Sequence, residues 1–533
     1  MKFLPFLFLI GLLFAGCQAE KTANTSSKKV FKYNQHNNIT SLDPAFARSQ
    51  ANSWAIDHLY NGLLQLGIDG EVLPSIAKKW TVTNDGLKYT FFLRTDVFFH
   101  SNSVFKDSTR CVVASDFRYS FERILDDKVA SPGSWIFRGK VSENQPFIAV
   151  NDSVFELNLS KPFLPILGIL TMGYCAVVPR EAVEKYGAEF RKNPVGTGAF
   201  SFKKWLDNQA LFLKKNENYF EKDSLNVRLP YLDGVKISFI SDRKTAFLEL
   251  MKGNLDHLNG LESSYSTELL NNKGLLKDCH KSKINFIKSP FLNTEYLGIR
   301  IDKSANNPLQ IKQLRQALNY ALDKNAMLKA LRNNVGKAAQ EGFLPNGLAK
   351  YPTIGYAYEP AKAAQLIKEA GFDDSHKIPK IQLIVSKDYS DLCAYITRQW
   401  EELGIKVEIE LSESATLRER MTKGQAPFFR ASWIADYPDA ESFFAVFYGK
   451  NPAPPNYTHF QNDLFDKLYE QLVSEKIESS RQLICKKMDE ILIEEAPVIF
   501  LFYDESAVFT SRKIHNLHSN NLNILSLKNV KKD

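Results

Sequence analysis

The sequence predicts an α/β fold in which several strand-and-helix segments share one compact body. Strand patterns alternate with amphipathic helix patterns, and one stretch of the second half has the strand–helix–strand order of a βαβ unit. The composition of the 533 residues, with 44% hydrophobic, 12% aromatic and 24% charged, is that of a globular protein with a large core. No long linker follows Lys29, so any domains are wound into each other.

Period-two hydrophobic patterns and turn residues mark the elements of the first half. Asn84-Asp85-Gly86 lies between two strand patterns and predicts a hairpin. Ser115 is the expected N-cap of a helix, and Asp242 of another, because their side chains can accept a hydrogen bond from the first turn. The predicted elements are strands at Val72 to Pro74, Trp80 to Val82, Lys88 to Arg94, Ala199 to Trp205 and Ala210 to Lys214, and helices at Ser115 to Leu125 and Asp242 to Met251.

The second half is richer in helix patterns. Pro360 suits the first position of a helix and Gly371 suits the residue after its end. The βαβ unit consists of a strand, a helix that ends at Gly404, and a second strand. The predicted elements are helices at Lys312 to Ala321, Pro360 to Ala370 and Leu392 to Leu403, and strands at Ile381 to Ser386 and Ile405 to Leu411.

The N-terminus has the order of a secretory signal peptide, predicted over residues 1–16. Met1-Lys2 is positively charged, Phe3 to Phe14 is apolar but too short to span a membrane, and small residues follow. The ending at Cys17 resembles a bacterial lipobox, with Phe14 where Leu is usual, so Cys17 is the predicted lipidation site. An ordinary signal peptide with an incidental Cys is the alternative. Residues 17–29 are polar and small, as in a flexible tether.

Composition and motifs argue against several function classes. A net charge of +8 without a block of like charges does not support nucleic-acid binding. Phosphate-loop, zinc-protease and nucleophile-elbow motifs are absent, and the S-x-x-K spacing at Ser103 lacks its companion motifs. The nine His residues are scattered, and the five Cys after Cys17 show no metal spacing, although up to two disulfides stay open. We therefore predict no metal and no cofactor.

A set of ordered segments carries a family resemblance over the chain from about Val30 to its end. Together they resemble the extracytoplasmic solute-binding proteins of peptide ABC transporters, the oligopeptide- and dipeptide-binding family. Ser41-Leu-Asp-Pro44 and Gly196-Thr-Gly198 are interpreted as architectural parts of this pattern. The segments are residues 41–44, 59–74, 77–80, 85–94, 116–123, 194–198 with 216–219, 231–235, 314–323, 358–362 with 370–371, and 433–439.

The resemblance implies a bilobed periplasmic-binding-protein fold of the large type. Two α/β lobes are joined by crossing strands, and an extra β-rich subdomain is inserted in lobe I. Such proteins close on a ligand by a hinge. The implied boundaries are 30–60, 190–290 and 506–533 for lobe I, 61–189 for its inserted subdomain, and 291–505 for lobe II.

The resemblance also implies binding residues in lobe II. Asp436, in the Trp-x-Ala-Asp-Tyr segment, matches the carboxylate that holds the free α-ammonium of a peptide, although a loop Asp that caps a turn is the alternative. Trp433 matches an aromatic residue beside the ligand, with core packing as the alternative. Arg430 matches an Arg that meets a peptide carboxylate, but it also fits an exposed surface position. Asp439 is expected to cap a turn.

In lobe I, Arg48, Ser49 and Gln50 fall where the family lends backbone to an extended peptide. Relatives can carry an acidic residue in place of Arg48, so a basic one alters the expected preference at the N-terminal end of the ligand. The return strand carries a run of tyrosines in relatives, of which only Tyr503 is left here. This departure leaves the length selectivity open.

The predicted function is a lipid-anchored component of the cell envelope, periplasmic and membrane-bound through a fatty acid such as palmitate on Cys17. It captures oligopeptides between its lobes and delivers them to the permease of an ABC transporter, and we expect a monomer. The same scaffold specialised for murein peptides or for a nickel chelate or haem is an alternative. A secreted hydrolase is the alternative of another class, but no nucleophile–base pair with credible spacing supports an enzyme.

Overall fold

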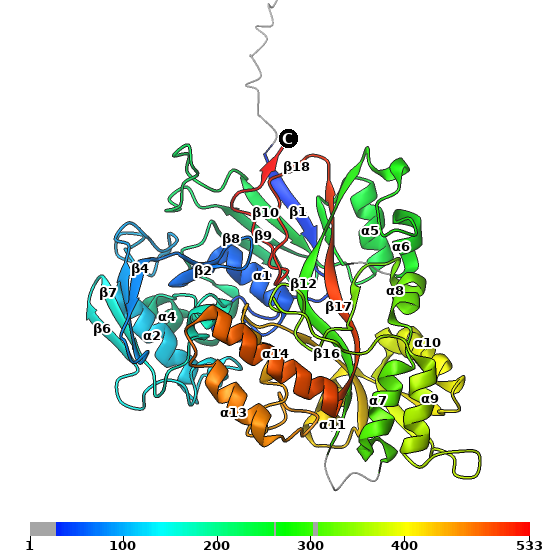
Figure 1. Ribbon diagram of the computed structural model, residues 1–533. Coiled ribbons are helices and arrows are strands. Elements are labelled where there is room, and N and C mark those ends of the chain that lie inside the picture. The colour runs from blue at the N-terminus through cyan, green and yellow to red at the C-terminus, as the bar shows by residue number, and fades with distance from the viewer. Residues whose placement is uncertain (1–27, 261–262, 302–306) are drawn as a thin grey trace, which may run out of the picture.

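The computed structural model describes residues 28–260, 263–301 and 307–533. The predicted signal peptide, Cys17 and most of the predicted tether lie outside the described residues. The chain folds into two lobes that share one mixed sheet (Figure 1). We call the part around β1 and β8–β11 the first lobe, and the part around β14–β16 the second lobe.

Eleven strands of the described residues join this sheet. In spatial order they are β15 (Val407–Ser412), β14 (Ile381–Ser386), β16 (Phe428–Ile434), β12 (Ile284–Ile299), β17 (Val498–Ser511), β11 (His257–Asn259), β1 (Val30–Asn34), β10 (Gly234–Ser238), β9 (Ala210–Lys215) and β8 (Phe200–Leu206), while β13 (Lys337–Ala338) also pairs with β17. β14 and β15 are parallel, as the predicted βαβ unit requires, and β8 and β9 confirm the predicted strand pair.

The long antiparallel strands β12 and β17 connect the two lobes. Figure 1 shows them side by side in the middle of the molecule. Their register shifts between Pro290 and Thr294, where proline lacks the N–H that a regular ladder needs. The predicted lobe boundaries, after residues 290 and 505, fall inside these two strands and stay a prediction.

A smaller sheet forms the predicted β-rich insertion, in the order β4 (Ala77–Val82), β5 (Lys88–Leu93), β7 (Val154–Asn158) and β6 (Phe147–Asn151). The hairpin between β4 and β5 turns at Gly86, whose φ is +73°. Helix α2 (Ala114–Leu125) buries Phe117 and Phe121 against this sheet. Its predicted N-cap at Ser115 is wrong: Val113 holds that position, and the Asp116 carboxylate accepts from the Val113 N–H at 2.9 Å.

The remaining helices cover the sheets or line their edges. In the second lobe, α9 begins at Pro360 as predicted, and α10 starts two residues earlier than expected. The helices are α1 (Gln50–Leu59), α3 (Ile166–Ile169), α4 (Arg180–Tyr186), α5 (Arg243–Met251), α6 (Ser263–Leu269), α7 (Lys312–Tyr320), α8 (Lys324–Arg332), α9 (Pro360–Glu369), α10 (Ser390–Glu401), α11 (Ser414–Thr422), α12 (Ala440–Phe444), α13 (Asp463–Leu472) and α14 (Glu478–Glu495). The short strand pairs are β2 (Leu64–Leu66) with β3 (Val72–Pro74), and β18 (Ile514–His515) with β19 (Lys531–Lys532).

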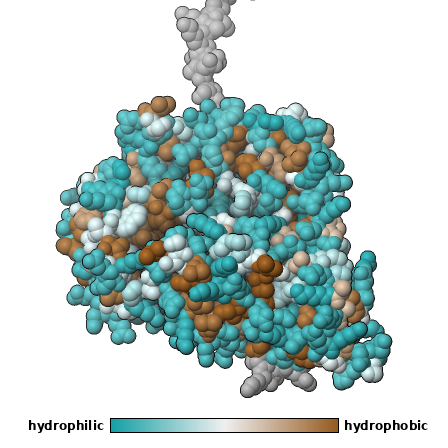
Figure 2. All heavy atoms as spheres, in the orientation of Figure 1, coloured by the Kyte–Doolittle hydropathy of each residue, from teal (hydrophilic) through white to brown (hydrophobic). Residues whose placement is uncertain are grey.

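Hydrophobic cores fill both lobes. One large cluster joins the sheet of the first lobe to the insertion, and two clusters lie in the second lobe. Hydrophilic residues dominate the upper part of the face in Figure 2, whereas apolar residues are more frequent in the lower part. Among the described residues, no helix is long and apolar enough to cross a membrane.

Two motifs interpreted as architectural have that role. Asp43 accepts from both terminal nitrogens of Arg123, at 2.7 and 2.6 Å, and so ties the start of the first lobe to α2. Gly196 and Gly198 lie against the end of α1, where a Cβ atom would come within 2.1 and 2.4 Å, respectively, of the backbone of Leu59. Only glycine allows this approach.

Candidate ligand-binding site

The loop that follows β16 carries the predicted ammonium-binding residue. The Ala435 N–H donates to the carbonyl oxygen of Leu292 on β12 at 2.8 Å, which holds the loop on the sheet. The Ser442 hydroxyl on α12 then accepts from the Asp436 N–H at 3.3 Å and from the indole of Trp433 at 3.5 Å. Trp433 and Asp436 are thus fixed to one another through a single side chain.

The carboxylate of Asp436 has no hydrogen bond or ion pair within the described part of the chain. The residue is exposed, yet protein lies on several sides of it. The loss of surrounding water, together with the charge of Glu441, raises the pKa of Asp436 to about 6. An anion that is accessible and uncompensated in this way can bind a cation without displacing a partner.

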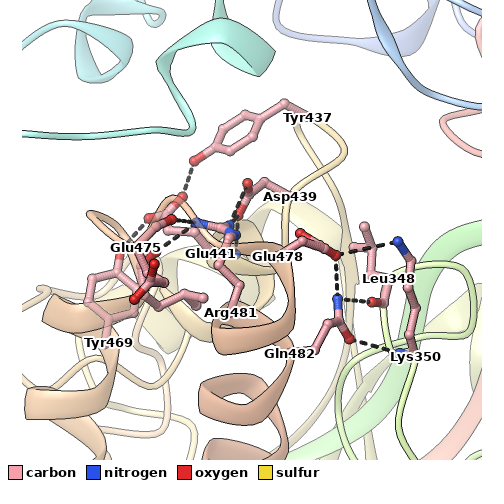
Figure 3. A network of polar contacts seen from close by, with 11 residues as sticks. Leu348, Lys350, Tyr437, Asp439, Glu441, Tyr469, Glu475, Glu478, Arg481 and Gln482 are labelled. Carbon is pink, nitrogen blue, oxygen red and sulfur yellow. Dashed lines mark hydrogen bonds and ion pairs between the residues drawn. The ribbon is translucent and has the colours of Figure 1, made fainter. Parts of the chain in front are cut away.

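A second carboxylate lies behind Asp436. Glu441 is buried and accepts hydrogen bonds from the hydroxyls of Tyr437 and Tyr469 (Figure 3). Burial raises the pKa of Glu441, while these two hydrogen bonds oppose the rise. The charge of Lys140 also lowers this pKa, but no ion pair joins Lys140 to Glu441 among the described residues. When ionised, Glu441 increases the negative potential at Asp436.

The carboxylate of Asp439, unlike that of Asp436, has hydrogen-bond and ion-pair partners within the protein. It caps α12 by accepting from the Glu441 N–H at 2.9 Å, and it pairs with Arg481 at 2.7 Å (Figure 3). Arg481 also donates to the carbonyl oxygen of Leu472 at 2.7 Å. The predicted turn-capping role of Asp439 is therefore confirmed, and its charge is balanced within the protein.

The three predicted residues of the first lobe lie at the start of α1 and are exposed. Ser49 is the N-cap, and its hydroxyl accepts from the Asn52 N–H at 3.2 Å. The guanidinium of Arg48 makes no hydrogen bond or ion pair among the described residues. The first lobe therefore presents an unpaired cation, whereas the second lobe presents an unpaired anion.

Tyr174 lies close to both charges. It follows Gly173, where a methyl group would lie 3.5 Å from the Cβ atom of Ala47, next to Arg48. Burial and the charge of Asp436 raise the pKa of Tyr174 to about 12, and Arg48 opposes this rise. The charges of both predicted binding regions therefore act on one tyrosine.

The lobes are also in direct contact near this point. The ring of Tyr437 lies 3.4 Å from the position that a Cβ atom on Gly168 would take. The Leu164 N–H donates to the carbonyl oxygen of Val473 at 2.8 Å, and Lys476 Nζ donates to that of Asn84, also at 2.8 Å. Asp436 is therefore placed next to an interface between the insertion and the second lobe.

Arg430 and Tyr503 differ from Asp436 and Arg48 because each is buried and its side chain is bonded to a neighbouring residue, although Arg430 Nε has no hydrogen-bond partner among the described residues. Arg430 is only 8% exposed, pairs with Glu295 and has the ring of Tyr389 at 3.0 Å. The alternative of an exposed surface Arg is therefore wrong. Tyr503 is buried and donates to the carbonyl oxygen of Gly342 at 2.8 Å. Ligand contact by either residue stays a prediction and would require an existing interaction to break.

Sequence reasoning missed Tyr174, Glu441 and Ser442. Tyr174 lies in an apolar stretch that carried no functional signal, and the other two are ordinary polar residues after the Trp-x-Ala-Asp-Tyr segment. Their roles depend on contacts between lobes or across a turn, which spacing alone does not indicate. Within the described residues, no cluster of His, Cys, Asp or Glu suits a metal ion, and the five cysteines are free thiols.

Comparison with known proteins places this geometry in a family. The model of the bacterial extracellular solute-binding proteins, family 5 Middle, matches residues 71–455. The chain is 26% identical over 474 residues to the dipeptide-binding protein of Escherichia coli K12, with 85% of this chain and 84% of that protein covered. It is also 26% identical over 501 residues to heme-binding protein A of Haemophilus influenzae, with 90% and 88% covered.

A solved structure shows the same fold. The periplasmic binding protein DppA from Helicobacter pylori, in complex with the peptide STSA, superposes with a TM-score of 0.77 at 24% sequence identity, covering 94% of this chain and 98% of that chain. The bilobed fold predicted from the sequence is confirmed by this match and by the shared central sheet. Because the family model matches well over half of its length, this chain belongs to the bacterial extracellular solute-binding proteins of family 5.

Proposed function

We propose that this protein captures peptides outside the cytoplasmic membrane, between its two lobes, and delivers them to the permease of an ABC transporter. The observation that carries the proposal is the unpaired, accessible carboxylate of Asp436. The family supports a transport component rather than an enzyme. The dipeptide-binding relative and the peptide complex of the H. pylori protein support a peptide as the solute.

The free α-ammonium of the peptide pairs with Asp436. In a site where protein replaces water, an ammonium needs such a partner, since an unpaired buried charge costs several kcal/mol. The negative charge of Glu441 strengthens the attraction of the ammonium to Asp436. Trp433 supplies a flat apolar surface beside this carboxylate. An amine ligand is favoured over haem, the ligand named for one relative, because a carboxylate is a poor partner for the acidic groups of haem.

Arg48 gives the site a preference at the N-terminal end of the ligand. Its unpaired guanidinium lies in the first lobe close to Tyr174, which Asp436 also approaches. A peptide whose first side chain is acidic would place its carboxylate near Arg48 while its ammonium pairs with Asp436. Murein peptides, which combine amines and carboxylates, remain within this class of ligand.

Two parts of the proposal concern the whole protein in its envelope. The lipid anchor is proposed on Cys17 and is tested by labelling cells with a palmitate analogue, which should mark the protein and not a Cys17→Ser variant. The monomeric state is tested by light scattering of the mature protein, which should give a mass near that of one chain.

Native mass spectrometry of protein purified without denaturation tests the proposed solute. We expect co-purified masses that form a series of short peptides and disappear after mild unfolding and refolding. A single non-peptide mass, such as haem, would overturn the proposal that the cargo is a peptide. Peptide cleavage by the purified protein, abolished by one Ser, Cys or Asp substitution, would instead show a hydrolase.

A further inference from the structure

A polar cavity lies in the first lobe, between α1, β2 and the C-terminal segment. Its volume is about 120 Å³, which accommodates several water molecules or a short alkylammonium chain. Several residues that line it are partly exposed, so solvent reaches it. The polar side chains around it include Asp57, Thr171, Tyr219, Asn520, Ser526 and Lys528.

The charges around this cavity do not balance. Lys528 Nζ donates to Glu221 Oε2 and to Gln65 Oε1, both at 2.6 Å, so this ammonium is already paired. The carboxylate of Asp57, by contrast, has no hydrogen bond or ion pair within the described residues. Counting Glu221, Lys528 and Asp57 together leaves one uncompensated negative charge when Asp57 is ionised.

Neutral neighbours cannot supply the missing positive charge. His58 is buried, its Nε2 lies 3.4 Å from the Tyr33 hydroxyl, and burial lowers its pKa to about 3, so it stays neutral. Burial alone raises the pKa of Asp57 to about 7. Tyr33, Tyr60 and Tyr219 are buried, and their pKa values are raised well above the ordinary value.

Some buried polar atoms at or near the cavity have no hydrogen-bond partner in the described part of the chain. Ser75 lines the cavity, and its buried hydroxyl has no partner. Glu221 Oε1, on the carboxylate that binds Lys528, has none either, but Glu221 does not line the cavity. A buried polar atom without a partner costs about 1 to 3 kcal/mol, so the Ser75 hydroxyl favours an occupant with which it can form a hydrogen bond.

Residues beside the cavity contact segments of the proposed peptide site. Asp57 Oδ1 lies 3.8 Å from the position of a Cβ atom on Gly173, the neighbour of Tyr174. On the other side, the carbonyl oxygen of Asn521 accepts from the Leu292 N–H at 2.7 Å, and the Leu292 carbonyl oxygen accepts from Ala435, next to Asp436. Asp57 and Asn520, which line the cavity, thus lie beside segments that lead to Tyr174 and to Asp436.

We propose that this cavity is a second ammonium-binding pocket, with Asp57 as its counter-ion, which takes the amine of a basic side chain of the bound peptide. This proposal deepens the proposed function, because it assigns ligands with two amines as a preferred class. A primary ammonium matches the single negative charge and donates three hydrogen bonds. A free alkylammonium ion has the same chemistry and is the other source that the experiment separates.

The test compares Ala-Ala-Ala-type peptides that carry lysine at each position in turn with peptides that carry norleucine there, by calorimetric titration. We expect lysine at one position to bind at least tenfold more tightly than norleucine, and Asp57→Asn to remove this preference while norleucine peptides bind as before. Asp107→Asn is the matched control, because Asp107 is an exposed carboxylate that lines neither site.

A second readout uses n-propylammonium chloride without peptide. If the cavity takes a free amine, the salt should lower the pKa of Asp57, followed by carboxyl NMR, and raise the melting temperature in wild type but not in Asp57→Asn. The proposal is overturned if wild type shows no lysine preference and propylammonium has no effect that depends on Asp57. The lysine comparison is made in wild type, so it holds even if Asp57→Asn folds poorly. If wild type binds no peptide while propylammonium binds, the proposed function fails and the pocket stands.

Discussion

Arg430 and Asp436 lie on the same strand-and-loop segment, six residues apart, but differ in how their charges are compensated. Arg430 is buried with the carboxylate of Glu295 and the ring of Tyr389 around it. Asp436 is accessible, and the charge among the described residues that shifts its pKa is that of Glu441, another acid. A charge balanced within the protein supports the scaffold, whereas an unbalanced one is available to a ligand.

The largest effect expected from this comparison is on stability. Arg430→Met should lower the free energy of unfolding by about 3 to 5 kcal/mol, because it leaves Glu295 buried without its partner. Denaturant unfolding measures this. The double variant Arg430→Met/Glu295→Gln should recover part of the loss, and a single variant as stable as wild type would show that the pair is not a structural element.

The next effect is the pH dependence of binding. Because the pKa of Asp436 is raised to about 6 in the ligand-free protein, its ionised form, which binds an ammonium, is lost below that pH. The dissociation constant of a free-amine peptide should then rise about tenfold per pH unit below pH 6. Affinity should fall again above about pH 8 as the peptide amine loses its proton.

Calorimetric titration between pH 4.5 and 9 measures this profile, and an N-acetylated peptide is the control. Its affinity should show no such bell shape. A flat profile for the free-amine peptide would mean that Asp436 does not titrate in the binding reaction.

A smaller effect is expected from Asp436→Asn on stability. A carboxyl whose pKa is higher in the folded than in the unfolded state destabilises the fold above that pKa, and the penalty is relieved as the pH falls from about 6 to 4. The variant should therefore be as stable as wild type at pH 7, or more stable by less than about 1 kcal/mol, because solvent screens an exposed charge. A clear destabilisation would indicate that Asp436 is structural.

The smallest effect is expected from Arg48→Gln. Its guanidinium is exposed, and such charges typically contribute about 0.2 to 1 kcal/mol to a pair. Peptides with glutamate in the first position should lose a few-fold in affinity relative to those with glutamine, and more so at low salt. Equal affinities of wild type and variant for both peptides would remove Arg48 from the site.

The sequence predicts the helices and strands better than it predicts the residues of the binding site. Local signals located β5, α5 and α9, because hairpin turns, N-caps and proline act within a few residues. The N-cap of α2 was missed, since Asp116 reaches back to the Val113 N–H and leaves Ser115 unused. The spacing of the five cysteines along the chain likewise leaves their pairing open, and the structure shows them as free thiols.

For the site, the resemblance proposes Asp436 and Arg48, but it does not say which charges are paired. Glu295, the partner of Arg430, is 135 residues away in the sequence, and β12 must pair with β16 before the two side chains meet. Tyr174 and the Asp57 cavity depend on contacts between segments that are distant along the chain. Charge balance is therefore a property of the fold, and the structure is needed to find the groups that are left unpaired.

The central claim is that Asp436 holds the free amine of a peptide. The most direct measurement is calorimetric titration of wild type, Asp436→Asn and the control Asp107→Asn with one co-purified peptide and its N-acetylated form. We expect wild type and the control to prefer the free amine by about 2 kcal/mol or more, and Asp436→Asn to bind both forms equally weakly. If the substitution weakens both forms by the same factor and leaves the preference intact, Asp436 does not bind the ammonium.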